Sequence, residues 1–135
     1  MRREYFCPHC GATLNPNIKI ILLISNGDQK GLVLASPQPG DYELIVPREL
    51  TLKNGDLVTI ECAVCGADLK SNVDEKLAKV GFRDSTGEGG HVDFSRVFGE
   101  HATYFVTRES VQSYGEHADV YHGRNFFGEG RLTYF

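Results

Sequence analysis

Two short stretches of this chain, residues 7–14 and 62–69, both follow the pattern C-x-x-C-G-A-x-L. Each C-x-x-C can place two thiolates on one side of a tight turn, and a tetrahedral zinc ion takes four such ligands at about 2.3 Å. The two matched pairs therefore predict one shared metal site, most simply a structural zinc. Its ligands would be all four cysteines of the chain: Cys7, Cys10, Cys62 and Cys65.

The residues that follow each second cysteine support this prediction. Gly11 and Gly66 occupy the same place in the two copies. A turn of this kind often needs a positive φ at that place, which glycine adopts at little steric cost. Leu14 and Leu69 follow where apolar side chains can pack over the site and keep water out.

Other roles for the cysteines are disulfide bonds, a redox dithiol or unrelated buried thiols. Disulfides belong to oxidising compartments. The six residues before Cys7 leave no room for a signal peptide, so we expect a cytoplasmic location. A thioredoxin-like dithiol would need a βαβ context and would not be duplicated. We therefore favour the shared metal site over these alternatives.

With these cysteines and glycines, the chain resembles the zinc-ribbon and rubredoxin-like superfamily over roughly residues 1–70. The resemblance implies a ribbon built around Zn²⁺. Rubredoxin-like relatives hold iron and carry electrons, so iron is the less favoured alternative, and ligand type alone does not separate the two metals. One departure is the spacing, because 51 residues separate Cys10 from Cys62. That length predicts a folded β insertion in place of a short ribbon loop.

Proline, glycine and β-branched residues recur at short spacing and predict an all-β chain. The turn Asn26-Gly27-Asp28 predicts a hairpin. Residues 71–78 form either a short helical turn or a loop between two halves. The predicted strands are 18–25, 31–36, 42–46, 57–62, 80–84, 91–98, 101–107 and 110–114. The organisation expected is a zinc-ribbon β domain (1–72), an antiparallel β meander (73–122), and an aromatic and glycine-rich tail (123–135).

The pattern aromatic-Gly-Glu-His-Ala occurs twice in the second half, at residues 98–102 and 114–118. Glutamate and histidine can bind zinc or transfer protons. Neighbours on a strand point to opposite faces, so only one of each Glu-His pair could face a shared site unless the glycine forms a bulge. We favour two related β segments with solvated Glu-His pairs. A second site that uses His91, His101, His117 and neighbouring acidic residues such as Asp93 stays an alternative.

Charge and motifs narrow the function classes. The net charge is −4 and only Arg2 and Arg3 are adjacent basic residues, whereas nucleic-acid binders usually carry a basic patch. No apolar run approaches the roughly 20 residues of a membrane span. The sequence contains no G-x-S-x-G, H-E-x-x-H or Walker pattern. We therefore expect no nucleic-acid partner, no membrane insertion and no catalytic residue.

The last 17 residues of the chain (119–135) are rich in aromatics, namely Tyr121, Phe126, Phe127, Tyr134 and Phe135. Such a density is untypical of a disordered tail. The segment can pack on its own sheet or dock on another chain. The predicted function is a non-catalytic, zinc-binding protein-interaction or assembly module, with a protein partner or self-association through this tail. A transcription-associated nucleic-acid ribbon, a rubredoxin-like iron electron carrier and a metalloenzyme are the alternatives.

Overall fold

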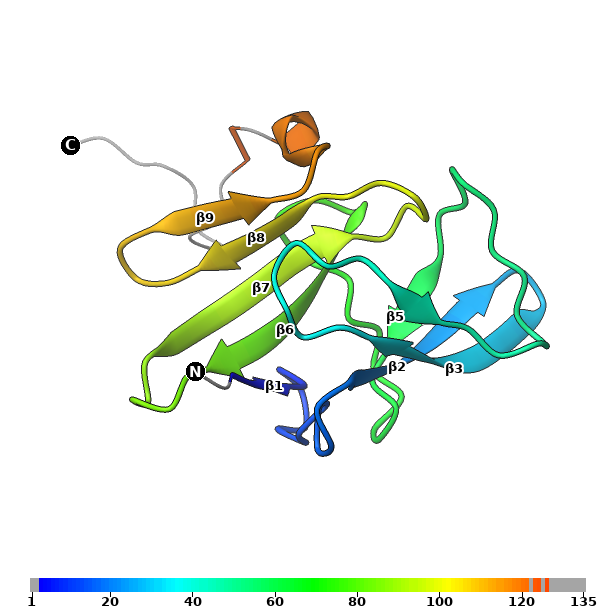
Figure 1. The fold of residues 1–135 in the computed structure, drawn as a ribbon, viewed down its shortest axis with the longest axis horizontal. Helices are drawn as coiled ribbons and strands as arrows, with labels where there is room; N and C mark the ends of the chain where they lie inside the picture. Colours follow the sequence, from blue (N-terminus) through cyan, green and yellow to red (C-terminus); the bar gives the residue numbers. More distant parts are fainter. Residues whose placement is uncertain (1–2, 122, 125, 127–135) are drawn as a thin grey trace.

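The structure, a computed structural model, describes residues 3–121, 123–124 and 126. This part of the chain is nearly all β, so the predicted fold class is confirmed. The strands form two antiparallel sheets (Figure 1). Only one short helical segment occurs among the described residues, the four-residue 3₁₀ helix η1 (Ala118–Tyr121).

The first sheet has five strands in the order β1-β6-β7-β8-β9. Their bounds are β1 (Glu4–Phe6), β6 (Leu77–Arg83), β7 (Gly89–Ser95), β8 (Thr103–Val106) and β9 (Val111–Tyr114). Consecutive strands β6 to β9 are neighbours, which confirms the predicted C-terminal meander.

The second sheet has four strands in the order β4-β3-β2-β5. It is built from residues that lie between the two cysteine pairs in the sequence, so that segment is folded β structure, as predicted. The bounds are β2 (Ile20–Asn26), β3 (Gln29–Ala35), β4 (Leu44–Ile45) and β5 (Thr59–Glu61). The predicted hairpin of β2 and β3 is present, with Asn26 paired to Gln29 around the turn.

All eight predicted strands differ in length from the observed ones, and β1 was not predicted. Specific bonds accompany the changed bounds of three of them, β4, β7 and β6. β4 is only two residues long, and Tyr42 before it is held at the other sheet by its hydroxyl, which donates to the Tyr114 carbonyl at 3.0 Å. β7 begins at Gly89, because the Asp84 carboxylate accepts the amides of Thr86 (2.9 Å) and Glu88 (3.2 Å) and so closes a short loop.

β6 begins at Leu77, and residues 71–76 form a loop, which is one of the two predicted alternatives. The side chains of this loop bond to nearby amides. Ser71 Oγ accepts from Val73 N (3.0 Å), and Asp74 Oδ1 accepts from Lys76 N (2.9 Å). Such local bonds compete with the hydrogen bonds of a helix, which explains why no helical turn forms.

The main core lies between the two sheets. Side chains alternate along the strands, so that Leu22 and Ile24 of β2 and Ile60 of β5 face inward and are at most 5% exposed. They belong to one cluster with inward residues of the first sheet, including Val80, Phe82, Val92 and Phe105. Burying each of these side chains stabilises the fold by about 1.5–3 kcal/mol.

A smaller apolar cluster covers the other face of the meander. Tyr121 and Phe126, 1% and 5% exposed, pack with Tyr104, whose ring centroid lies 4.4 Å from that of Phe126. Two of the five tail aromatics therefore pack on their own sheet. The other three, Phe127, Tyr134 and Phe135, lie outside the described residues.

The repeated glycines of the second half generate a stability prediction. Gly99 and Gly115 have φ values of +87° and +102°. A Cβ at Gly115 would overlap the carbonyl oxygen of His101, whereas a Cβ at Gly87 (φ +87°) would meet nothing within 4 Å. We expect Gly115→Ala to lower the free energy of unfolding by about 3 kcal/mol or more. The matched variant Gly87→Ala should cost only about 1–2 kcal/mol. Urea unfolding measures both, and equal losses would contradict the close approach.

Candidate metal centre

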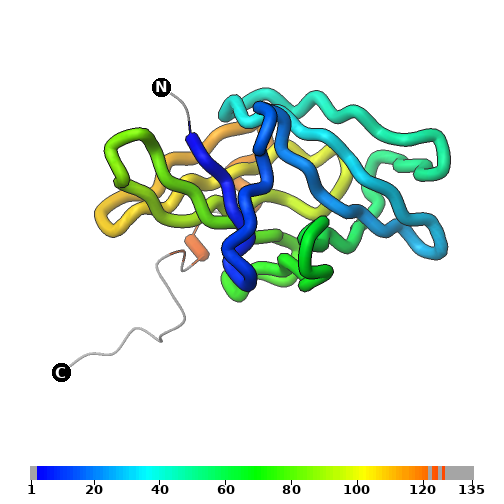
Figure 2. Tube along the Cα trace, turned by 90° about the horizontal axis from the view of Figure 1, so that it is seen from below, coloured from blue at the N-terminus to red at the C-terminus, as the bar shows by residue number. Residues whose placement is uncertain are grey.

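The four cysteines lie on two turns that come together in space. We call them the first knuckle (residues 7–13) and the second knuckle (residues 62–68). They lie side by side in both views, as blue and green loops (Figures 1 and 2). The first knuckle connects β1 to the segment that leads into β2, and the second connects β5 to the segment that leads into β6. Each knuckle therefore lies where the chain passes from one sheet to the other.

The two knuckles have the same backbone structure. The amide of the glycine donates to the carbonyl of the first cysteine, at 2.9 Å from Gly11 to Cys7 and at 2.9 Å from Gly66 to Cys62. The φ values of these glycines are +77° and +75°. This agrees with the left-handed conformation expected from the sequence, which favours glycine over any residue that carries a Cβ.

The four sulfur atoms lie within 4.8 Å of one another, and two of the distances between them match a tetrahedral metal site. Cys7 Sγ lies 3.8 Å from Cys65 Sγ, and Cys10 Sγ lies 3.8 Å from Cys62 Sγ. A tetrahedron with metal–sulfur bonds of about 2.3 Å has sulfur–sulfur edges of about 3.8 Å. A disulfide bond would bring two sulfurs to about 2.0 Å. All four cysteines are free thiols, and the group fits a zinc-ribbon-like metal site.

Backbone amides stabilise negative charge on the buried sulfurs. Cys7 and Cys62 are 0% exposed, while Cys10 and Cys65 are exposed. Burial raises the pKa of the Cys62 thiol, but the amides of Cys65 and Val64, 3.4 Å and 3.3 Å from its sulfur, outweigh this and lower the pKa to about 7. For Cys7, burial dominates and the thiol pKa is raised. The second knuckle thus offers a thiolate near neutral pH, the form that binds metal.

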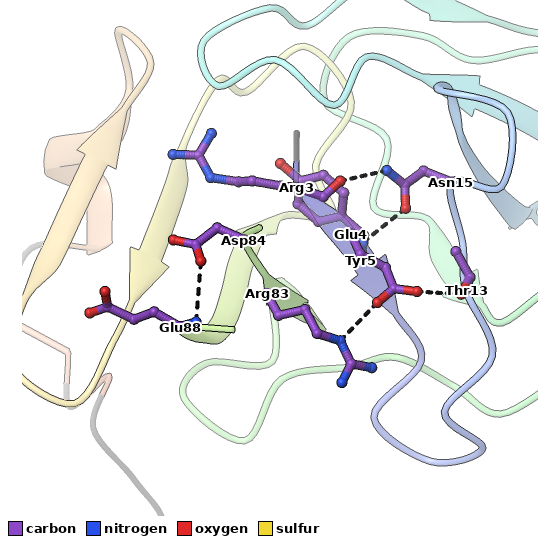
Figure 3. A network of polar contacts seen from close by, with 8 residues as sticks. All are labelled: Arg3, Glu4, Tyr5, Thr13, Asn15, Arg83, Asp84 and Glu88. Atoms are coloured by element: carbon purple, nitrogen blue, oxygen red, sulfur yellow. Dashed lines mark hydrogen bonds and ion pairs between the residues drawn. The ribbon is translucent and has the colours of Figure 1, made fainter. Parts of the chain in front are cut away.

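Polar contacts join β1 and Arg3 before it to Thr13 and Asn15 at the end of the first knuckle (Figure 3). The buried Asn15 carboxamide accepts from Tyr5 N at 2.8 Å and donates to the Arg3 carbonyl at 2.9 Å. Glu4 accepts from the Thr13 hydroxyl at 2.7 Å and from Arg83 Nε of β6 at 2.8 Å. The Glu4–Arg83 pair is solvent-exposed and contributes little to stability, so the Asn15 bonds are the main polar support.

The second knuckle is held between both sheets. The amide of Leu69 donates to the Ile60 carbonyl at 2.8 Å, and the amide of Lys79 in β6 donates to the Leu69 carbonyl. The corresponding Leu14 amide donates to the Tyr5 carbonyl at 2.7 Å. Leu14 and Leu69 are 2% and 1% exposed, so both leucines pack into the core directly behind the cysteines.

The histidines of the alternative second site divide into two places. His91 Nδ1 lies 2.7 Å from Asp93 Oδ2 on the same face of β7, as their spacing predicted. The fully buried Asp93 also accepts from the Ser71 hydroxyl at 2.6 Å. In the repeats, by contrast, His101, Glu116 and His117 converge, with candidate ligand atoms within 4.8 Å of one another.

The hydrogen bonds of this second group connect the two repeats to each other. His101 N donates to His117 Nδ1 at 2.9 Å, and His117 N donates to the His101 carbonyl at 2.9 Å. An imidazole nitrogen that accepts a hydrogen bond carries no proton, so the proton of neutral His117 lies on Nε2. Neither nitrogen then has a free lone pair for a metal. The arrangement supports a structural role for His117.

Tyr42 is a site residue that the sequence analysis did not identify. Its ring stacks on the His101 ring at 4.4 Å with an interplanar angle of 7°. It belongs to the loop before β4, and no local pattern relates it to a histidine 59 positions later. Only the tertiary structure brings the two rings together.

Comparisons with protein-family models, with curated proteins and with solved structures found no match. The relation to zinc ribbons therefore rests on the four converging cysteines. Among the residues that the structure describes, no helix is long and apolar enough to cross a membrane.

Replacing one ligand tests whether the site holds the fold together. We expect Cys62→Ser to lose the bound metal and to lower the free energy of unfolding by about 3 kcal/mol or more, because metal binding is coupled to folding. The control is Val64→Ala in the same knuckle, whose side chain is 69% exposed. It should keep both metal and stability. A Cys62→Ser protein with one metal equivalent and an unchanged melting temperature would refute the site.

Proposed function

We propose that this protein is a non-catalytic assembly module whose fold is secured by one zinc ion bound to Cys7, Cys10, Cys62 and Cys65, and which associates with a second copy of itself. The zinc would supply a fixed tetrahedral connection between the two knuckles. The observation that carries the proposed association is an apolar surface on the second sheet.

The outer face of the second sheet presents a continuous row of apolar side chains. Cross-strand pairing places them side by side, since Ile21 pairs with Leu34, Leu23 with Leu32, and Leu34 in turn with Ile45. Leu32 and Ile45 are 55% and 58% exposed. We call these five residues the outer apolar face. Contiguous exposed apolar patches often mark interaction sites, because monomeric soluble proteins rarely expose large ones.

The charges beside the outer apolar face favour a second copy as the occupant. Lys30 and Glu61 flank the patch on the same face of the sheet, and their side chains pair with each other at 3.1 Å. The flanking charges therefore cancel. A neutral apolar patch is complementary to itself, and a two-fold dimer would bury it on both chains by packing sheet against sheet.

The net charge of −4 favours protein association over contact with nucleic acid phosphates. Docking through the tail stays a prediction for residues 127–135, which the structure does not describe. The cytoplasmic location stays an expectation, and iron stays the alternative metal that elemental analysis distinguishes from zinc.

Native mass spectrometry with elemental analysis tests the metal and the assembly together. We expect one zinc per chain and a dimer that carries two. A red protein with one iron per chain would instead support the electron carrier. A protein that contains no metal after purification under reducing conditions, and gains none when zinc is added, would overturn the proposed metal.

A charge placed in the outer apolar face should separate the dimer. We expect Leu32→Asp to raise the dimer dissociation constant by at least about tenfold, since a buried unpaired carboxylate costs more than 1.4 kcal/mol. The matched control is Val120→Asp. Val120 is 53% exposed and belongs to η1, which packs on the first sheet, away from the outer apolar face. Sedimentation equilibrium measures both. A wild-type chain that stays monomeric, or a Leu32→Asp dimer as tight as the control, would refute this interface.

A further inference from the structure

A cavity of about 390 Å³ lies between the two sheets. Its walls come from inward-facing apolar residues of both sheets, such as Ile20 of β2 and Phe94 of β7, and from the loop that precedes β4. Protein interiors are normally packed to crystal density and contain few voids larger than a water molecule. This volume lies instead in the range of small-molecule sites, about 300–1,000 Å³.

Several apolar side chains of the cavity wall are only partly buried. Ile20, Val46, Leu52 and Phe94 pack against the core cluster yet retain accessible surface. These side chains lie on the inner side of the molecule and line the cavity. Their accessible surface therefore faces the cavity and not a neighbouring side chain. An apolar ligand would remove it from water and gain the corresponding hydrophobic stabilisation.

One side chain of the wall offers a defined hydrogen-bond acceptor. His101 Nδ1 lies 3.2 Å from Glu116 Oε1. A carboxylate only accepts, so the tautomer that fits this pair has its proton on Nδ1 and leaves a lone pair on Nε2. Stacking on Tyr42 fixes the ring plane, and the Tyr42 hydroxyl is already engaged with Thr103 at 2.8 Å and with the Tyr114 carbonyl at 3.0 Å. The polar contact available from this group is therefore an acceptor.

The charges around the cavity disfavour an anionic ligand. The acidic residues Asp41 and Glu43 line it against one cation, Arg96. Glu100 also belongs to the wall, but its carboxylate accepts from the Tyr121 hydroxyl at 2.6 Å, on the other face of the meander. The Arg96 guanidinium is occupied by backbone, since its Nε donates to the Val58 carbonyl at 2.9 Å and its Nη1 to the Glu75 carbonyl. A fatty acid or other carboxylate would meet net negative charge, while a neutral molecule would not.

We propose that this cavity is a binding site for a neutral, largely apolar small molecule that carries one hydroxyl group, which donates a hydrogen bond to His101. The site uses none of the four cysteines of the metal centre, and it lies on the opposite side of the second sheet from the outer apolar face. Naphthalene and 2-naphthol are matched probes, since they differ by a single hydroxyl.

Titration of the full-length protein with both probes, followed by fluorescence, tests the proposal. We expect 2-naphthol to bind about five- to tenfold more tightly than naphthalene, the value of one net hydrogen bond. In His101→Phe this preference should fall below about twofold while naphthalene still binds, which shows that the cavity remains intact. The carboxylate 2-naphthoate should bind more weakly than either probe.

Blocking variants locate the bound probe. Ile20→Trp should fill the cavity and abolish binding, whereas Ile21→Trp, its neighbour on the opposite face of β2, should leave binding unchanged. Should Ile20→Trp fail to fold, Ala35→Phe serves instead, because Ala35 pairs with Ile20 in register and also lines the cavity. Absence of binding to the wild-type protein, or equal binding by the blocking variants and Ile21→Trp, would overturn the inference.

Discussion

The fold depends on the contact between the two knuckles. At each knuckle the chain passes from one sheet to the other, and the four cysteine sulfur atoms come together there. β1 lies in the five-stranded sheet, but the first knuckle sends the chain into the four-stranded sheet, and the second knuckle returns it. Closing the 51-residue segment between Cys10 and Cys62 costs conformational entropy. The sheets alone must offset that cost through a core made by short strands, three of which have three residues or fewer. A metal bound at the closure point would supply the difference, since its binding free energy is also folding free energy.

Local features of the fold could be predicted from the sequence, because neighbouring residues determine them. The knuckle conformation follows from a cysteine pair and a glycine, and the β2–β3 hairpin follows from an Asn-Gly-Asp turn. The inward side of β5 follows from alternation at Ile60 and at Val58, the residue just before the strand. The pairing of β1 with β6 could not be predicted in this way. Tyr5 pairs with Phe82 across most of the chain, and no local pattern encodes so distant a contact.

The histidine repeats show where strand periodicity stops being informative. Alternation predicts that adjacent Glu and His point apart, yet Glu116 and His117 both approach His101. These residues lie outside the strands, because β8 begins at Thr103 and β9 ends at Tyr114. The positive φ of Gly115 turns the chain back, and two backbone-mediated bonds then join the repeats. The glycine was the informative signal, whereas the tautomer of His117 follows only from its tertiary hydrogen bond.

Tyr5 connects the metal centre to the cavity between the sheets. It lies two residues before Cys7, is 2% exposed, and its ring meets Phe105 edge to face at 6.4 Å. Its hydroxyl donates to the carbonyl of Pro37 at 2.7 Å, in the loop that forms one side of the cavity. The same side chain thus touches the first knuckle's strand, the core and the cavity wall. Metal at the knuckles and a ligand in the cavity would stabilise one common arrangement of the two sheets. If the unliganded protein also samples states in which the two sheets separate, thermodynamic linkage applies. Bound metal then raises the apparent affinity of the cavity for its ligand, and the bound ligand raises the apparent affinity of the knuckles for metal by the same factor.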